Sequence, residues 1–240
     1  MRIAIVSDVH GNLSALEAVL SDLRDTSPDL VLHGGDLADG GARPAAVVDC
    51  VIDQGWDGVV GNTDEMLFDA GALTEFARAA NEALLPMFQA IEQMAAFTRA
   101  ALGETRIAWM RELPRGRTHE LLALVHASPG DLWRAPGRDA SDAELDQVYR
   151  SLGRKRVVYG HIHQPFVRRI AEMTIANSGS VGLSHDGDAR AAYLLLDEAG
   201  PQIRRVEYDL ERELKALRES ALPHADWVAR TLKTARTQMP

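Results

Sequence analysis

Five short apolar segments of this chain are each followed by residues whose side chains commonly bind divalent metals. The segments are rich in Val, Ile or Leu, which is typical of buried β-strands. Because the carboxyl ends of parallel strands meet in one crevice of an open α/β sheet, we expect these polar residues to lie close together. The segments and the residues that follow them are Ile3–Val6 with Asp8 and His10, Leu30–Leu32 with Asp36, Val59–Val60 with Asn62, Leu121–Val125 with His126, and Val157–Tyr159 with His161 and His163.

These seven residues supply carboxylates, imidazoles and an amide oxygen, without sulfur. Such donors favour Mn, Fe, Co, Ni or Zn. Seven ligands are too many for one tetrahedral ion, but they suit two ions that share a carboxylate. Two metals about 3.5–4 Å apart can hold both the attacking and the leaving oxygen of a displacement at phosphorus. The pattern therefore predicts a dinuclear metal centre that acts on phosphate esters.

The first sixty residues alternate strand-like and helical patterns, with strands over Ile3–Val6, Leu30–Leu32 and Gly58–Val60 and a helix over Pro44–Gln54. This βαβαβ order predicts a parallel sheet with right-handed crossovers. Further short strands with glycine turns are expected over residues 165–208.

Residues 64–118 are rich in Ala, Leu and Met and contain few β-branched residues, which predicts a helical insert. Its apolar side would pack as core, and one edge would cap the metal crevice. Residues 209–240 are expected to form C-terminal helices with an amphipathic pattern. No repeat or linker divides the chain, so we expect a single domain over 1–240.

The charge and cysteine content narrow the partners and the compartment. The 26 basic and 35 acidic residues give a net charge of −9, which argues against nucleic acid, a nuclease activity or an anionic membrane. Cys50 is the only cysteine, which excludes an intrachain disulfide and thiolate zinc clusters and favours the reducing cytoplasm. The apolar start is too short for a signal peptide, and no apolar run approaches the ~18 residues of a membrane span.

In this order, Asp-x-His, Gly-Asp, Gly-Asn-x-Asp, a lone His and Gly-His-x-His resemble the signature of the calcineurin-like metallophosphoesterases. The motifs span residues 8–163, and the stretch 177–188 is similar to the small bacterial phosphodiesterase branch of that family. The resemblance implies an α/β fold in which a sandwich of two mixed β-sheets is flanked by helices.

The resemblance also implies a role for each of the seven residues. A hydroxide that bridges two divalent ions would attack phosphorus, with Asp36, Asn62 and His126 as the catalytic residues. Mn²⁺ is the expected metal, and Fe, Zn, Co and Ni are alternatives. The implied ligands are Asp8, His10 and His163 for the first metal, Asn62, His126 and His161 for the second, and Asp36 as the bridge between them.

The chain departs from the family pattern at Thr63, where many members have a histidine that is thought to protonate the leaving group. Threonine cannot act as a general acid near neutral pH, and a missing acid slows a poor leaving group by roughly 10²–10⁴-fold. We therefore expect activated phosphodiesters or phosphoanhydrides to be preferred over alkyl phosphomonoesters and phosphoproteins.

Three further residues are candidates for substrate contact, each with a structural alternative. Asn12 either caps the following helix or touches substrate. Asp64 contacts substrate, orients His126 or another ligand, or has a free surface role. Asn177 could support the site from its loop.

The favoured function is that of a phosphodiesterase with a small-molecule substrate. The alternative is a dinucleoside-polyphosphate hydrolase, for example one that acts on diadenosine tetraphosphate. Thr63 disfavours a protein phosphatase, and the complete set of ligand positions disfavours a non-catalytic scaffold. The apolar residues Trp227, Val228 and Leu232 would pack within the chain or form a contact between copies of it.

Overall fold

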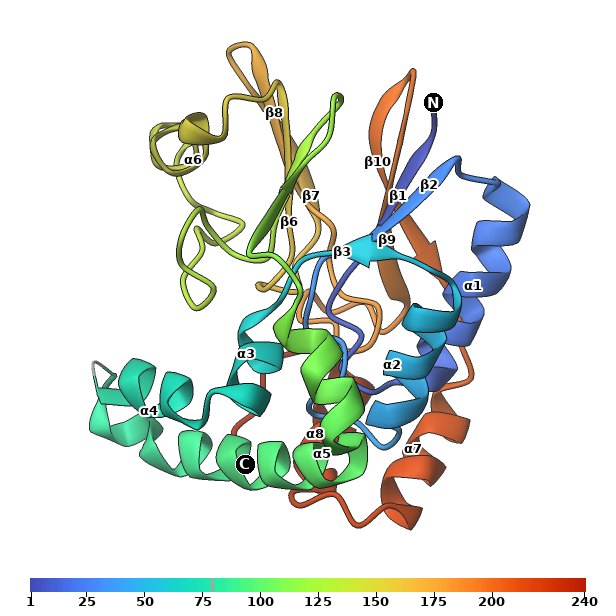
Figure 1. Ribbon diagram of the computed structural model, residues 1–240, viewed down its shortest axis with the longest axis vertical. Helices are drawn as coiled ribbons and strands as arrows, with labels where there is room; N and C mark the ends of the chain where they lie inside the picture. Colours follow the sequence, from blue (N-terminus) through green and yellow to red (C-terminus); the bar gives the residue numbers. More distant parts are fainter. Residues whose placement is uncertain (79) are drawn as a thin grey trace.

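The computed structural model describes residues 1–78 and 80–240, and two five-stranded mixed sheets form its centre (Figure 1). The order β10-β9-β1-β2-β3 makes up the first sheet, and β4-β5-β6-β8-β7 makes up the second. Strands β1, β2 and β3 are mutually parallel, as are β5, β6 and β8, and the outer strands join antiparallel. The expected sandwich of two mixed sheets is confirmed. The strands are β1 (Ile3–Val6), β2 (Leu30–His33), β3 (Asp57–Gly58), β4 (Gly116–Thr118), β5 (Ala123–Val125), β6 (Arg156–Tyr159), β7 (Phe166–Ile170), β8 (Met173–Asn177), β9 (Ala191–Asp197) and β10 (Gly200–Val206).

The alternation of side chains along β1 explains why this strand lies at the centre of the fold. Ile3 and Ile5 face the second sheet and join the core between the two sheets. Ala4 and Val6 point the other way and pack with residues of α1 (Leu13–Thr26) and α2 (Pro44–Asp53). Because both faces are covered, all four residues of β1 are buried, as a continuous apolar run predicts.

The segment expected as a helical insert is helical over most of its length. It contains α3 (Asn62–Phe68), α4 (Ala70–Arg78), a short 3₁₀ turn (Glu82–Leu84) and α5 (Leu85–Arg111). Its last part differs from the expectation for 64–118, because β4 (Gly116–Thr118) is a strand that pairs antiparallel with β5. Three residues at the edge of a sheet are too few to show a periodicity in the sequence.

The remaining helices lie on the outside of the sandwich. Helix α6 (Asp142–Tyr149) packs on the outer face of the second sheet through Leu145 and Tyr149. The expected C-terminal helices are α7 (Leu210–Glu219) and α8 (Ala225–Thr234). Within residues 1–78 and 80–240, no helix combines the length and the apolar character that crossing a membrane requires.

Candidate metal centre

Five loops bring the seven predicted ligands together where the strands end. Each loop leaves the carboxyl end of a parallel strand, which is where ligand sites form in such sheets. Asp8 and His10 follow β1, Asp36 follows β2, Asn62 begins α3, His126 follows β5, and His161 and His163 follow β6.

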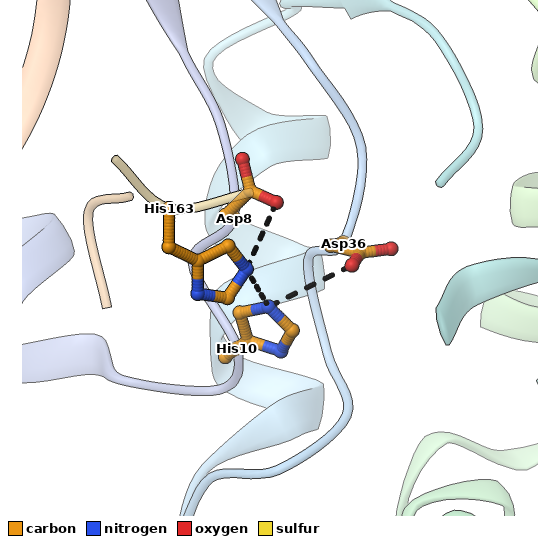
Figure 2. A group of neighbouring side chains, drawn as sticks. All are labelled: Asp8, His10, Asp36 and His163. Atoms are coloured by element: carbon orange, nitrogen blue, oxygen red, sulfur yellow. Dashed lines mark hydrogen bonds and ion pairs between the residues drawn. The ribbon is translucent and has the colours of Figure 1, made fainter. Parts of the chain in front are cut away.

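The first group of side chains comes from the loops after β1, β2 and β6, and Figure 2 shows the four pointing toward one another. Nε2 of His163 lies 3.2 Å from Oδ1 of Asp8 and 3.2 Å from Nε2 of His10. Nε2 of His10 lies 3.7 Å from Oδ2 of Asp36. All four residues are buried, and one ligand atom from each falls within 4.8 Å of the others. The spacing suits four atoms that share one divalent ion.

The second group is built around Asn62, whose Oδ1 lies 2.9 Å from Nε2 of His126 and 2.9 Å from Nδ1 of His161. Nε2 of His126 is in turn 3.5 Å from Oδ2 of Asp36. The same oxygen of Asp36 therefore faces an imidazole of each group. Two metals that share one ligand require a carboxylate placed in this way, between two sets of ligands.

Backbone carbonyls fix the protonation of three of the imidazoles. A carbonyl can only accept a hydrogen bond, so the imidazole nitrogen that faces it carries the proton and leaves a lone pair on the other nitrogen. Nδ1 of His10 faces the carbonyl of Asp39 at 2.7 Å, Nδ1 of His126 faces that of Gly34 at 2.8 Å, and Nδ1 of His163 faces that of Leu183.

In the neutral form that binds metals, this tautomer leaves buried acceptors that face one another. The Nε2 lone pairs of His10 and His163 meet at 3.2 Å, and the Nε2 lone pair of His126 meets the amide oxygen of Asn62. Oδ2 of Asp8 is buried and has no hydrogen-bond partner among residues 1–78 and 80–240. Acceptors that are buried and face other acceptors are unfavourable unless a cation lies between them. The donors therefore fit divalent metals.

The backbone is strained at most of these positions. Nine non-glycine residues of the described chain have a positive φ, and five of them are predicted ligands. Such conformations are unfavourable for L-residues, although Asp and His tolerate them better than most. Their concentration in one place is typical of a functional site. The five are Asp8 (56°), His10 (49°), Asp36 (54°), His161 (67°) and His163 (55°).

The pKa values of the site reflect burial and close charges. Burial alone would raise the pKa of Asp8, but in the metal-free protein the protonated form of His163, whose own pKa is raised, donates to this carboxylate and holds the pKa of Asp8 well below its usual range. Burial and the neighbouring charge of His126 lower the pKa of His161 to about 4. At neutral pH Asp8 is a carboxylate and His161 is neutral, and these are the forms that bind metals.

Asp64 is completely buried and supports another ligand, Asp36, rather than His126, which is one of the roles expected for it. Its two oxygens accept hydrogen bonds from the backbone N–H groups of Asp36 (2.8 Å), Leu37 (2.9 Å) and Gly61 (3.0 Å). Burial and the charge of Asp36 raise the pKa of Asp64 to about 7. The carboxylate thus holds together the loops that carry Asp36 and Asn62.

Asn12 and Asn177 are also buried, and each has the structural role that was one of the expectations for it. Oδ1 of Asn12 accepts from the N–H of Ala15 at 3.0 Å and so caps α1. Asn177 donates to the carbonyl of Gly160 and accepts from the N–H of Gly179. Asn177 therefore supports the loop that carries His161 and His163.

Thr63 is the one candidate substrate residue with a free polar group. Its backbone N–H donates to Oδ1 of Asp36 at 2.9 Å, while its hydroxyl is buried without a partner among the described residues.

Asp39 is a residue of the site that the sequence did not reveal. Its carbonyl orients His10, and its buried carboxyl accepts from the hydroxyl of Thr98 at 2.8 Å. Nothing in the sequence marks a residue that acts through its backbone.

Comparison with known proteins gives a consistent result. Residues 1–200 match the family model described as the calcineurin-like phosphoesterase superfamily domain. An uncharacterized protein of Methanocaldococcus jannaschii is 26% identical, with 98% of each chain covered.

Two solved structures are similar over nearly the whole chain. A metallophosphoesterase from Sphaerobacter thermophilus is 26% identical, with a TM-score of 0.79 and coverage of 98% of this chain and 99% of that one. A hypothetical protein from Pyrococcus horikoshii has a TM-score of 0.83 at 15% identity, with 99% of each chain covered, and so shares the fold. The match of the family model over most of the chain, together with a buried Asp/His cluster suited to divalent metals, shows that this protein belongs to the calcineurin-like phosphoesterase superfamily.

Proposed function

We propose that this protein is a phosphodiesterase that uses two divalent metals. The observation that carries the proposal is the position of Oδ2 of Asp36, 3.7 Å from Nε2 of His10 and 3.5 Å from Nε2 of His126, between two groups of ligand atoms. In this proposal Asp36 binds both ions. The other proposed ligands are Asp8, His10 and His163 for one ion and Asn62, His126 and His161 for the other.

The metals and the protein have separate tasks in this reaction. When bound, two divalent ions acidify a water molecule and polarise the phosphate oxygens. Asn62 turns its amide oxygen toward two imidazoles, which leaves its amide nitrogen to donate to a phosphate oxygen. The carbonyl of Gly34 keeps the lone pair of His126 directed into the site. We propose Mn²⁺ as the metal, with Fe, Zn, Co and Ni as alternatives that accept the same donors.

The preference for a diester rests on Thr63. Thr63 contacts the centre through its backbone N–H, which donates to Asp36, and its hydroxyl stays neutral and protonated at physiological pH. Without a stronger acid at this position, a poor leaving group would react roughly 10²–10⁴-fold more slowly. Activated phosphodiesters and phosphoanhydrides tolerate this loss better than alkyl monoesters do.

A paired rate assay tests the proposal. Metal-stripped protein is reloaded with Mn²⁺ and given bis-p-nitrophenyl phosphate and p-nitrophenyl phosphate in parallel. We expect metal-dependent hydrolysis of the diester, and we expect Asp36→Asn to abolish it, because the amide has only one oxygen and no charge with which to hold two cations. As a control, the same exchange at an exposed residue of α1, Asp25→Asn, should leave the activity as in wild type.

The outcomes separate the alternatives. Faster hydrolysis of the monoester would contradict the diester preference. Two metals bound without hydrolysis of either compound would favour a narrower phosphoanhydride substrate, such as a dinucleoside polyphosphate. If the protein bound no metal, the proposal that it is a metal-dependent enzyme would be refuted.

A further inference from the structure

A pocket of about 220 Å³ lies directly beside the candidate metal centre. His10, Thr63 and His185 border it on the side of the centre. Its apolar lining comes from α5, from the loop after β8 and from α8, namely Met87, Ile91, Met94, Leu183, Trp227 and Val228. The pocket therefore joins a polar, metal-binding end to an apolar end.

Packing between helices fixes the apolar end. Met94 of α5 and Val228 of α8 belong to one buried cluster that also includes residues of α7. Figure 1 shows α5 and α8 together below the edge of the sheets. Because both walls belong to a packed cluster, their spacing does not depend on a bound molecule.

The segment after α8 completes the wall. It lines the pocket through Thr237 and Gln238. The indole N–H of Trp227 donates to the carbonyl of Gln238 at 2.9 Å, and the N–H of Gly187 donates to the carbonyl of Ala235 at 2.8 Å. Two hydrogen bonds thus hold the segment against α8 and the loop after β8.

None of the described residues that line the pocket is Lys or Arg, so the pocket itself offers no strong partner for a phosphate. Thr63 and Asp39 are the polar residues that line it next to His10, and neither carries a positive charge. Anionic oxygens would therefore lie at the metal end and uncharged carbon at the other.

We infer that this pocket binds one organic substituent of the phosphoester, and that the substituent is a single apolar ring of the size of a phenyl group. The inference rests on the proposed function, because it assumes that the phosphorus lies on the metals. Pockets for drug-sized molecules measure about 300–1,000 Å³, so a volume of about 220 Å³ suits a smaller group. A second phosphate with its own nucleoside would find neither the room nor the cations.

Two phosphonates that are not hydrolysed test the inference by binding alone. Phenylphosphonate and methylphosphonate carry the same anionic group and differ only in the carbon substituent. We expect calorimetry on the Mn²⁺-loaded protein to give a Kd for phenylphosphonate that is lower than that for methylphosphonate by about tenfold or more. The reason is that binding in the pocket removes the apolar surface of the ring from water. The affinity of methylphosphonate reports the metal end separately.

Variants that fill the pocket with a larger side chain test whether the preference for phenylphosphonate arises there. Ile91→Trp should remove the preference for phenylphosphonate, while Ile52→Trp, the same exchange at an exposed position of α2, should keep it. Should Ile91→Trp fail to fold, Thr237→Trp fills the pocket from an exposed position in the segment after α8.

Each result has one meaning. Equal binding of the two phosphonates to the wild-type protein would overturn the inference and leave the proposed function standing. The same conclusion would follow if the variant with a filled pocket still preferred phenylphosphonate. Failure of both to bind would overturn the two proposals together.

Discussion

Replacement of Asp64 by Asn should weaken both the fold and the metal centre. Its carboxylate accepts three backbone N–H groups, from Asp36, Leu37 and Gly61. An amide presents one oxygen, so it keeps at most the two bonds made by Oδ2 and turns its own N–H₂ toward Leu37. A buried donor without a partner costs about 1–3 kcal/mol. The raised pKa of Asp64 means that its buried charge is itself unfavourable in the metal-free protein, and the amide removes that charge. We therefore expect the free energy of unfolding to fall by no more than this amount.

The metal should be lost more easily as well, because Asp64 holds the strained backbone of Asp36. Loss of such a supporting residue typically lowers metal affinity by about 10–100-fold. The assay is urea unfolding of the metal-free protein and Mn²⁺ titration, both at pH 8, where Asp64 is ionised because its pKa is about 7. Asp25→Asn, an exposed exchange on α1, is the control. If the two variants cannot be distinguished, the supporting role of Asp64 is refuted.

Two further predictions concern groups buried away from the metals. Burial and the charge of Arg117 lower the pKa of His33 to about 3, so unfolding should be favoured as pH falls from about 6.5 toward 3, with about 2 kcal/mol lost by pH 5. In urea unfolding of metal-free protein at pH 7.5 and pH 5, His33→Leu should lose less stability than wild type, and His119→Leu should not differ from it. Arg43→Ala should cost about 3–5 kcal/mol in unfolding experiments, because it leaves the buried carboxylate of Glu213 without its 2.6 Å partner. The double variant with Glu213→Gln should recover part of that loss, and equal stability of Arg43→Ala and wild type would contradict the argument.

The order of strands and helices could be predicted where the apolar pattern is long enough. The strand predicted over Ile3–Val6 has the bounds that the structure gives, and the strands expected over residues 165–208 are β7 to β10. The strand expected over Gly58–Val60 ends at Gly58, because the N–H of Val60 bonds to the carbonyl of Pro114 and leaves the ladder. Apolar composition predicts burial, and it cannot tell which backbone group accepts the hydrogen bond.

The candidate site follows the same division. Strand ends are visible in the sequence, so the seven ligand positions could be predicted to converge. The residues that orient them could not, because His10, His126 and His163 are held by backbone carbonyls, which every residue has. The pocket beside the centre was equally hidden, since α5 and α8 are more than a hundred residues apart in the sequence.

The strained backbone and the chemistry of the site have one origin. Residues in sparsely populated conformations cost of order 1–3 kcal/mol each, so five of them together rival the whole stability of a typical domain. The loops after β1 and β2 offset this by bonding to each other, with the N–H of Asp8 on the carbonyl of Gly35 and that of His10 on the carbonyl of Asp36, each at 3.0 Å. The same turns aim the side chains at one another. Because backbone hydrogen bonds fix these loops, the ligand atoms whose lone pairs face one another cannot move apart. A metal ion that binds there finds its ligands already in place.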